Sequence, residues 1–303
     1  MAFDPAEFKK TLKYEGVMSP EEILGDIAAI QQLDKDAEGR RSTSGKIGGW
    51  SLALGFIGLL ITGATLDSNA DNAPMMFLVC FGLLGIGAAA LIYRATQGKF
   101  DTQDRRYLLL ERILPLLSAD LPPNAKVQVR MDLSAPSQGS KAAGEGEARG
   151  WKVKYFEDPW LALSGQFVDG TKFTLEAIEK FQKRSKWKTS ASGKMKHKSK
   201  TKSATLLSLR LGVKAKRYPA LARVSDKLES AVQLPKQAML KRVDASANGL
   251  ALKVLIKSEW DCPAHGEPPN GVDGRQLVAS LFMSAYQVLN LAKAVAKGRP
   301  RVV

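Results

Sequence analysis

Two long apolar runs joined by a short polar loop constrain this chain more than any other feature. The first, IGGWSLALGFIGLLITGATL, covers residues 47–66, and the second, MMFLVCFGLLGIGAAALIY, covers residues 75–93; neither contains a charged residue. An α-helix rises about 1.5 Å per residue, so runs of roughly 20 residues match a hydrocarbon core about 30 Å thick. The sequence therefore predicts a two-helix transmembrane hairpin within residues 46–94, rather than two buried helices of a soluble protein, which usually carry some polar positions.

The net charge of +15 is unevenly distributed along the 303 residues. Residues 1–123 hold 12 basic and 15 acidic side chains, a net of −3, whereas residues 124–303 hold 33 basic and 15 acidic side chains, a net of +18. The whole basic excess belongs to the second part, for which we expect anionic partners.

The loop between the two runs, residues 67–74, has two Asp and no Lys or Arg, whereas both outer flanks are basic. The flanking basic residues are Lys35, Arg40, Arg41 and Lys46 before the first run, and Arg94, Lys99, Arg105, Arg106 and Arg112 after the second. The positive-inside rule then places both termini in the cytoplasm. We expect an integral membrane protein of a bacterial inner membrane, whose first span is its uncleaved targeting signal because residues 1–45 contain no apolar signal-peptide core.

Residues 1–45 are expected to form cytoplasmic amphipathic helices. A capping side chain followed by Pro occurs at Asp4-Pro5 and at Ser19-Pro20, which predicts helices near 5–14 and 20–37. The stretch 38–45, EGRRSTSG, is expected to be a flexible link into the first span. After the second span, apolar residues at helical spacing predict a juxtamembrane helix within residues 95–123.

From residue 124 onward the apolar pattern changes from helical spacing to strict alternation, which is typical of strands with one buried face. Asp169-Gly170 and Asn248-Gly249 are dipeptides that accept positive φ and indicate hairpin turns. Because no crossover helix fits between these neighbours, the sheet is expected to be mainly antiparallel. The alternating segments are 127–133, 151–155, 207–213 and 250–256.

The rest of this region is expected to hold a flexible loop and two helices. The loop is predicted at 136–150 and the helices near 220–232 and 275–297, the second capped by Asp273 and stopped at Gly298. The predicted fold class is therefore a two-helix transmembrane hairpin plus a cytoplasmic α+β domain, residues 124–303, with a mainly antiparallel sheet and a long C-terminal helix packed on it.

The segment 184–203, RSKWKTSASGKMKHKSKTKS, is the sharpest local feature of the chain, with eight basic residues and no acid. If the segment is extended, side chains two positions apart share a face, and a turn around residues 190–193 places both arms side by side as a basic ribbon. The candidate anion-binding or lipid-binding residues are Arg184, Lys186, Lys188, Lys194, Lys196, Lys198, Lys200 and Lys202.

Anionic headgroups of membrane lipids are the first candidate partner of this ribbon, because an anionic leaflet attracts basic segments by about 1 kcal/mol per Lys or Arg. Nucleic acid ranks second, since only one aromatic residue, Trp187, is interleaved with the lysines and single-strand binders usually offer several. A protein partner or a second copy of the chain is a further alternative. A solvated, mobile loop without any ligand is the competing interpretation.

Residues that carry chemistry are sparse. Cys262 and His265 have a C-x-x-H spacing, but a structural zinc site needs about four ligands and the sequence offers no second Cys or His cluster. No catalytic residue, metal site or cofactor is predicted. The leading hypothesis is a membrane-anchored interaction or scaffolding module with a basic surface that contacts anionic lipid or an acidic partner. The alternatives are a membrane-tethered enzyme with an unrecognised site and a membrane protein that tethers nucleic acid.

Overall fold

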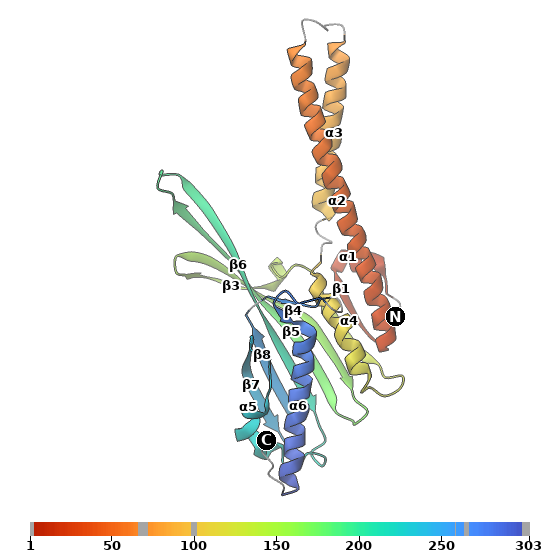
Figure 1. Cartoon of the computed structure of the whole chain (residues 1–303), viewed down its shortest axis with the longest axis vertical. Helices are drawn as coiled ribbons and strands as arrows, with labels where there is room; N and C mark the ends of the chain where they lie inside the picture. The colour runs from red at the N-terminus through yellow and green to blue at the C-terminus, as the bar shows by residue number, and fades with distance from the viewer. Residues whose placement is uncertain (1–2, 66–71, 98–101, 258, 264–266, 299–303) are drawn as a thin grey trace. The chain divides into compact units, whose positions relative to one another are not determined.

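The computed structural model describes residues 3–65, 72–97, 102–257, 259–263 and 267–298. The chain divides into two compact units. One unit comprises residues 1–27 and 103–303 and contains the sheet, whereas the other comprises residues 28–102 and contains a pair of long helices. Figure 1 gives the element labels used below.

An eight-stranded sheet forms the first unit, with strand order β1-β2-β4-β5-β6-β8-β7 and β3 added on β4. Every neighbouring pair is antiparallel, which confirms the expected mainly antiparallel sheet. The strands are β1 (Lys13–Met18), β2 (Val127–Asp132), β3 (Ala142–Ala148), β4 (Trp151–Gln166), β5 (Lys172–Thr189), β6 (Met195–Gly212), β7 (Ala238–Ser246) and β8 (Gly249–Ile256). A separate parallel pair is formed by β9 (Trp260–Asp261) and β10 (Val272–Asp273).

Alternation of apolar and polar residues decides which face of each strand is buried. In β8, Leu250, Leu252, Val254 and Ile256 are buried, whereas the residues between them are partly exposed. The predicted turn after β4 is present: Gly170 has φ of 81°, and the Asp169 carboxylate accepts a hydrogen bond from the Thr171 amide.

Two helices cover the apolar face of the sheet: α4 (Asp104–Ser118) and α6 (Gly274–Ala296). The expected C-terminal helix begins at its Asp273 cap, whose carboxylate accepts a hydrogen bond from the Gln276 amide. Phe282 of α6 packs on Phe173 of β5, with ring centroids 5.9 Å apart. The prediction that a long C-terminal helix packs on the sheet is confirmed.

Sequence predictions for three segments of the sheet unit are wrong in part. The N-terminal helix, α1 (Pro5–Thr11), is shorter than predicted, because the chain turns at Leu12 (φ 54°) and then enters strand β1. The predicted flexible loop at 136–150 contains a 3-10 turn, η1 (Gly139–Lys141), and strand β3. The predicted helix at 220–232 is a 3-10 helix, η2 (Leu221–Lys227), followed by one turn of α-helix, α5 (Leu228–Ala231).

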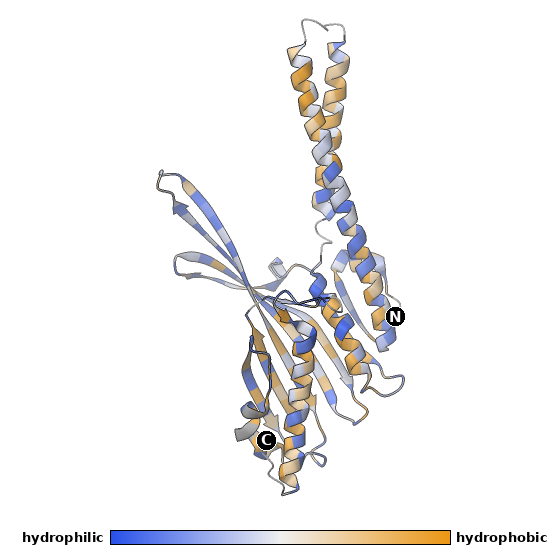
Figure 2. Cartoon of the chain, in the orientation of Figure 1, coloured by the Kyte–Doolittle hydropathy of each residue, from blue (hydrophilic) through white to orange (hydrophobic). Residues whose placement is uncertain are grey.

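Helix α2 (Pro20–Ala64) runs without interruption for 45 residues, so the predicted flexible link at 38–45 is helical. A short polar stretch between two helical segments continues the helix, because extending an existing helix costs far less than starting a new one. The Ser44 hydroxyl donates to the Arg40 carbonyl, which satisfies it within the helix. Figure 2 shows α2 changing from hydrophilic to hydrophobic along its length.

Helix α3 (Ala73–Gln97) packs against α2 through small residues, as expected for two apolar helices. A Cβ added at Gly87 would lie 2.7 Å from Leu52, and one added at Gly55 would lie 2.9 Å from Leu84. By length and composition, three described helices are apolar enough to cross a membrane: α2, α3 and α6. The structure therefore supports membrane association, and the described helices include one more candidate span than the two expected.

Candidate functional site

The basic segment forms the outer part of a long β-hairpin. Strands β5 and β6 pair from Lys172 opposite Gly212 to Thr189 opposite Met195, and Figure 1 shows them projecting beyond β8, which pairs with β6 only from Thr205 onward. The turn is closed by the Ser190 amide, which donates to the Lys194 carbonyl at 2.9 Å. The predicted turn at residues 190–193 and its two extended arms are confirmed.

Cross-strand register gathers the basic side chains on one side of this hairpin. Residues directly opposite each other on neighbouring strands point to the same face, and successive residues alternate between faces. Three opposing pairs are entirely basic: Arg184 with Lys200, Lys186 with Lys198, and Lys188 with Lys196. Lys202 follows on the same face, opposite Gln182. We call this surface the basic face, and it consists of Arg184, Lys186, Lys188, Lys196, Lys198, Lys200 and Lys202.

One predicted member of the ribbon, Lys194, and the interleaved aromatic residue Trp187 lie off the basic face. Lys194 lies in the turn before β6, so it is at the end of the hairpin rather than on the basic face. Trp187, the aromatic residue interleaved with the lysines, lies on the opposite face, where its ring is 5.0 Å from that of His197. Trp187 and Met195 share that opposite face and are 66% and 67% exposed.

The acidic residues of β3 point away from the basic face. Glu145 lies opposite Lys154 and Glu147 opposite Lys152, on the face that carries Trp187, and Glu145 forms an ion pair with Lys154 at 2.8 Å. On the basic face β3 contributes Gly146, which lies opposite Val153. The face opposite the basic face thus carries both carboxylates of β3 together with Lys152, Lys154 and Lys183, whereas β3 adds no charge to the basic face.

Sequence reasoning missed an aromatic residue beside the lysines. Trp151 begins β4, and the ammonium groups of Lys186 and Lys200 lie 4.6 and 5.8 Å from its ring centroid. A cation above an aromatic ring is attracted by about 0.5–1 kcal/mol at exposed sites, so Trp151 holds two lysines of the basic face in place. Strand pairing alone brings these residues together, since they are far apart in sequence.

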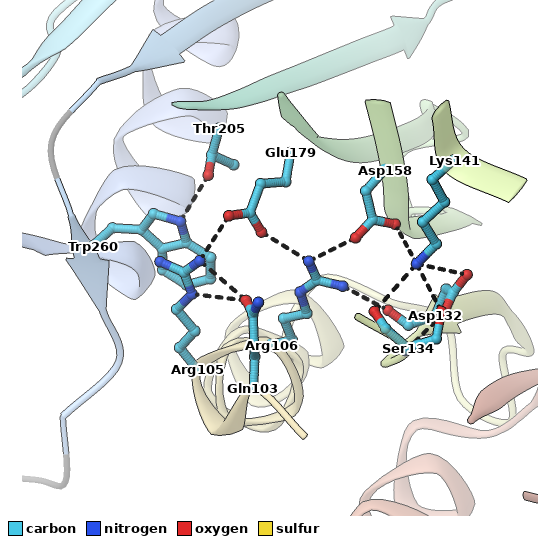
Figure 3. A network of polar contacts seen from close by, with 10 residues as sticks. All are labelled: Gln103, Arg105, Arg106, Asp132, Ser134, Lys141, Asp158, Glu179, Thr205 and Trp260. Atoms are coloured by element: carbon cyan, nitrogen blue, oxygen red, sulfur yellow. Dashed lines mark hydrogen bonds and ion pairs between the residues drawn. The ribbon is translucent and has the colours of Figure 1, made fainter. Parts of the chain in front are cut away.

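A buried ionic network, drawn in Figure 3, lies on the other face of the sheet. It is near the start of the projecting arm, because Glu179 lies opposite Thr205, where the pairing of β6 with β8 begins. Arg106 is fully buried, and it donates to the carboxylates of Asp158 and Glu179 at 2.7 Å and to the Asp132 carbonyl at 2.9 Å. Arg105 pairs with the other oxygen of Glu179 at 3.0 Å. Sequence reasoning counts both arginines among the membrane-flanking cations, whereas the structure uses them to fasten α4 to the strands.

Lys141 extends the network from the region predicted to be a loop. Its ammonium group lies 2.8 Å from Asp158 and 3.2 Å from Asp132, and it donates to the Ser134 hydroxyl. Burial raises the pKa of Asp132, but hydrogen bonds from Ser134 and the charge of Lys141 outweigh this effect, so the pKa is lowered overall. Three cations and three carboxylates balance in this network, which is what a structural support needs.

The Cys262 thiol does not have the properties of a nucleophile. It is buried, and burial raises its pKa to about 11, so the reactive thiolate is scarce at neutral pH. His265, its sequence neighbour in the C-x-x-H spacing, lies outside the described residues. No known protein family, curated protein or solved structure matches this chain.

Proposed function

We propose that this protein is a membrane-anchored interaction module that holds the basic face of its β5–β6 hairpin against anionic phospholipid. The carrying observation is the strand register, which places Arg184 opposite Lys200, Lys186 opposite Lys198 and Lys188 opposite Lys196. Like charges directly opposite each other on a sheet are destabilising, by an amount comparable to the roughly 0.2–1 kcal/mol of a favourable pair. An anionic partner on this face removes that repulsion.

The proposed membrane anchor consists of α2 and α3, with both termini of the chain in the cytoplasm. The most apolar windows of these helices are only 17% and 11% buried by the protein, which suits helices covered by lipid. The most apolar window of α6 is 44% buried by the protein, and its Leu277, Leu281 and Val288 are fully buried. Helix α6 is therefore assigned to the core of the sheet unit, and the basic flanks of α2 and α3 set the orientation.

Two features support lipid as the partner over nucleic acid. The exposed Trp187 and Met195 near the hairpin end lie on the face opposite the lysines, where a nucleic acid on the basic face would not touch them. The ring of Trp151, which is on the lysine side, already carries two ammonium groups rather than an open stacking surface.

Flotation with vesicles tests this proposal. The full chain is required, because a fragment that begins at residue 124 would lack strand β1 and helix α4. The chain is held in neutral phosphatidylcholine nanodiscs and mixed with vesicles of phosphatidylcholine alone or with phosphatidylglycerol. We expect association only with the second kind, and release as salt rises, since charges are screened over about 8 Å at physiological ionic strength.

Replacing Lys196, Lys198 and Lys200 by Gln should weaken this association about a hundredfold, because each lysine near an anionic leaflet contributes about 1 kcal/mol to binding and about 1.4 kcal/mol corresponds to a factor of ten. The matched control replaces three exposed lysines elsewhere on the sheet unit, Lys216, Lys236 and Lys241, with the same change in net charge. An equal loss of vesicle association in both variants would attribute the effect to net charge and would reject the hairpin as the binding site. Preferential binding of polynucleotide over the anionic vesicles would make nucleic acid the partner.

A further inference from the structure

A groove lies between α2 and α3, at the end of the helix pair away from the connecting residues 66–71. Its volume is about 850 Å³, and all of its lining residues come from these two helices. Small residues keep the groove open: Gly39 has nothing within 4 Å of the position of an added Cβ, and Ala89 and Ala90 line the facing helix. The cavity therefore belongs to the helix unit and is independent of the basic hairpin.

The polarity of the groove changes from one end to the other. Ile47 and Ile86 line one end and are 50% and 56% exposed, so their apolar surface is not covered by the protein. Lys35 and Arg40 line the other end. Residues 35 and 47 are separated by about 18 Å along the helix axis, at about 1.5 Å per residue.

Two cations and one carboxylate, Asp36, line the polar end, so its net charge is positive. Among the residues that the structure describes, neither Lys35 nor Arg40 takes part in an ion pair, and the carboxylate of Asp36 in the groove lining accepts a hydrogen bond from Gln32. Tyr93 stands at the rim with 47% of its surface exposed, and aromatic residues of this kind favour membrane interfaces. A groove with an exposed apolar end and a cationic end is complementary to a lipid, because an acyl chain can cover the apolar end and an anionic headgroup can pair with the cations.

We infer that this groove binds one anionic phospholipid molecule, with its phosphate on Lys35 and Arg40 and an acyl chain along Ile47 and Ile86. Basic pockets between membrane helices on the cytoplasmic side are suited to anionic headgroups. A second copy of the chain is the less suitable occupant, because a two-fold contact would bury the same unpaired cations from both copies. The inference rests on the proposal that α2 and α3 span the membrane, and it goes beyond the hairpin's contact with a lipid surface.

Native mass spectrometry of the full chain in mild detergent tests the site, since it counts retained lipids and subunits in one measurement. The delipidated protein is titrated with dioleoylphosphatidylglycerol or with dioleoylphosphatidylcholine. We expect one tightly retained phosphatidylglycerol and about fivefold weaker retention after Arg40→Gln, the effect of one charge near an anionic group. Ala89→Leu, which fills the groove without changing charge, should weaken retention as well.

Lys46→Gln is the matched control, because Lys46 is exposed on the same helix but does not line the groove. It should retain phosphatidylglycerol as the wild type does. Equal retention by wild type and Arg40→Gln, equal retention of the two lipids, or a dimer that excludes lipid would each overturn the inference. Resistance of the protein to carbonate extraction from membranes is measured separately, so failure of the spanning proposal is distinguished from failure of the lipid site.

Discussion

The buried Arg106 gives the sharpest prediction about stability. Its side chain is fully buried, contacts two carboxylates at 2.7 Å and lies 5.3 Å above the ring of Trp160. Arg106→Met keeps an apolar chain of similar length against that ring but removes the charge. The network then holds two cations and three carboxylates, so one negative charge is left uncompensated in the interior.

Removing one partner of a buried ion pair costs about 3–5 kcal/mol. The lower end applies here, because Glu179 keeps Arg105 at 3.0 Å and Asp158 keeps Lys141 at 2.8 Å. For a domain of about 150–250 residues, 1 kcal/mol shifts the unfolding midpoint by about 2–4 °C, so about 3 kcal/mol corresponds to about 6–12 °C. The variant should therefore unfold well below the wild type.

Thermal unfolding of the full chain in detergent, followed by circular dichroism in the β-sheet region, measures this shift. The double variant Arg106→Met/Glu179→Gln restores charge balance and should recover at least half of the lost stability. The single variant Glu179→Gln should destabilise the fold, since it leaves three cations with two carboxylates. If Arg106→Met unfolds within about 1 °C of the wild type, or if the two changes simply add, the network is not a charge-balanced support.

Three further predictions follow from single residues. Asp132→Asn should destabilise the fold by about 1–2 kcal/mol at pH 7. Because the pKa of Asp132 is lowered, its contribution to stability is present above about pH 4 and is lost as the pH falls through the lowered pKa. The unfolding midpoints of wild type and variant should therefore converge in acid, and a difference that stays constant with pH would refute this prediction. Gly87→Leu, whose new side chain would collide with Leu52, should lower the free energy of unfolding of the helix pair by about 1–3 kcal/mol, measured by circular dichroism of the helices. Gly82→Leu should leave it unchanged, because nothing lies within 4 Å of an added Cβ there. Cys262 should stay unmodified by a maleimide in the folded chain at neutral pH and react on unfolding, as measured by mass shift.

Local patterns predicted the parts of the fold that depend on local chemistry. Alternation identified strands such as β8, the dipeptides at Asp169 and Asn248 identified hairpin turns, and the Asp273 cap identified the start of α6. The even spacing of the lysines predicted the two arms of the β5–β6 hairpin. Each of these signals is carried by residues close together in sequence.

Features that depend on distant residues were missed. Strand β1 is short, contains Gly16, and is defined by its pairing with β2 more than a hundred residues later. Lys141 lies in a stretch of low apolar content that reads as a loop, and only the fold brings its ammonium group to Asp158. Whether a lysine points to the basic face, as Lys186 does, or away from it, as Lys183 does, follows from register rather than composition.

Energy transfer from the hairpin to the bilayer tests the central claim most directly. A donor dye is attached at Ser192→Cys, at the hairpin turn, in the full chain; Cys80 and Cys262 are buried, so the label is specific. The acceptor is carried by lipids of the nanodisc in which the protein is held. The account predicts that transfer rises when phosphatidylglycerol replaces part of the phosphatidylcholine, falls as salt rises, and loses this dependence when Lys196, Lys198 and Lys200 are replaced by Gln. Equal transfer in neutral and anionic nanodiscs at low salt would contradict it.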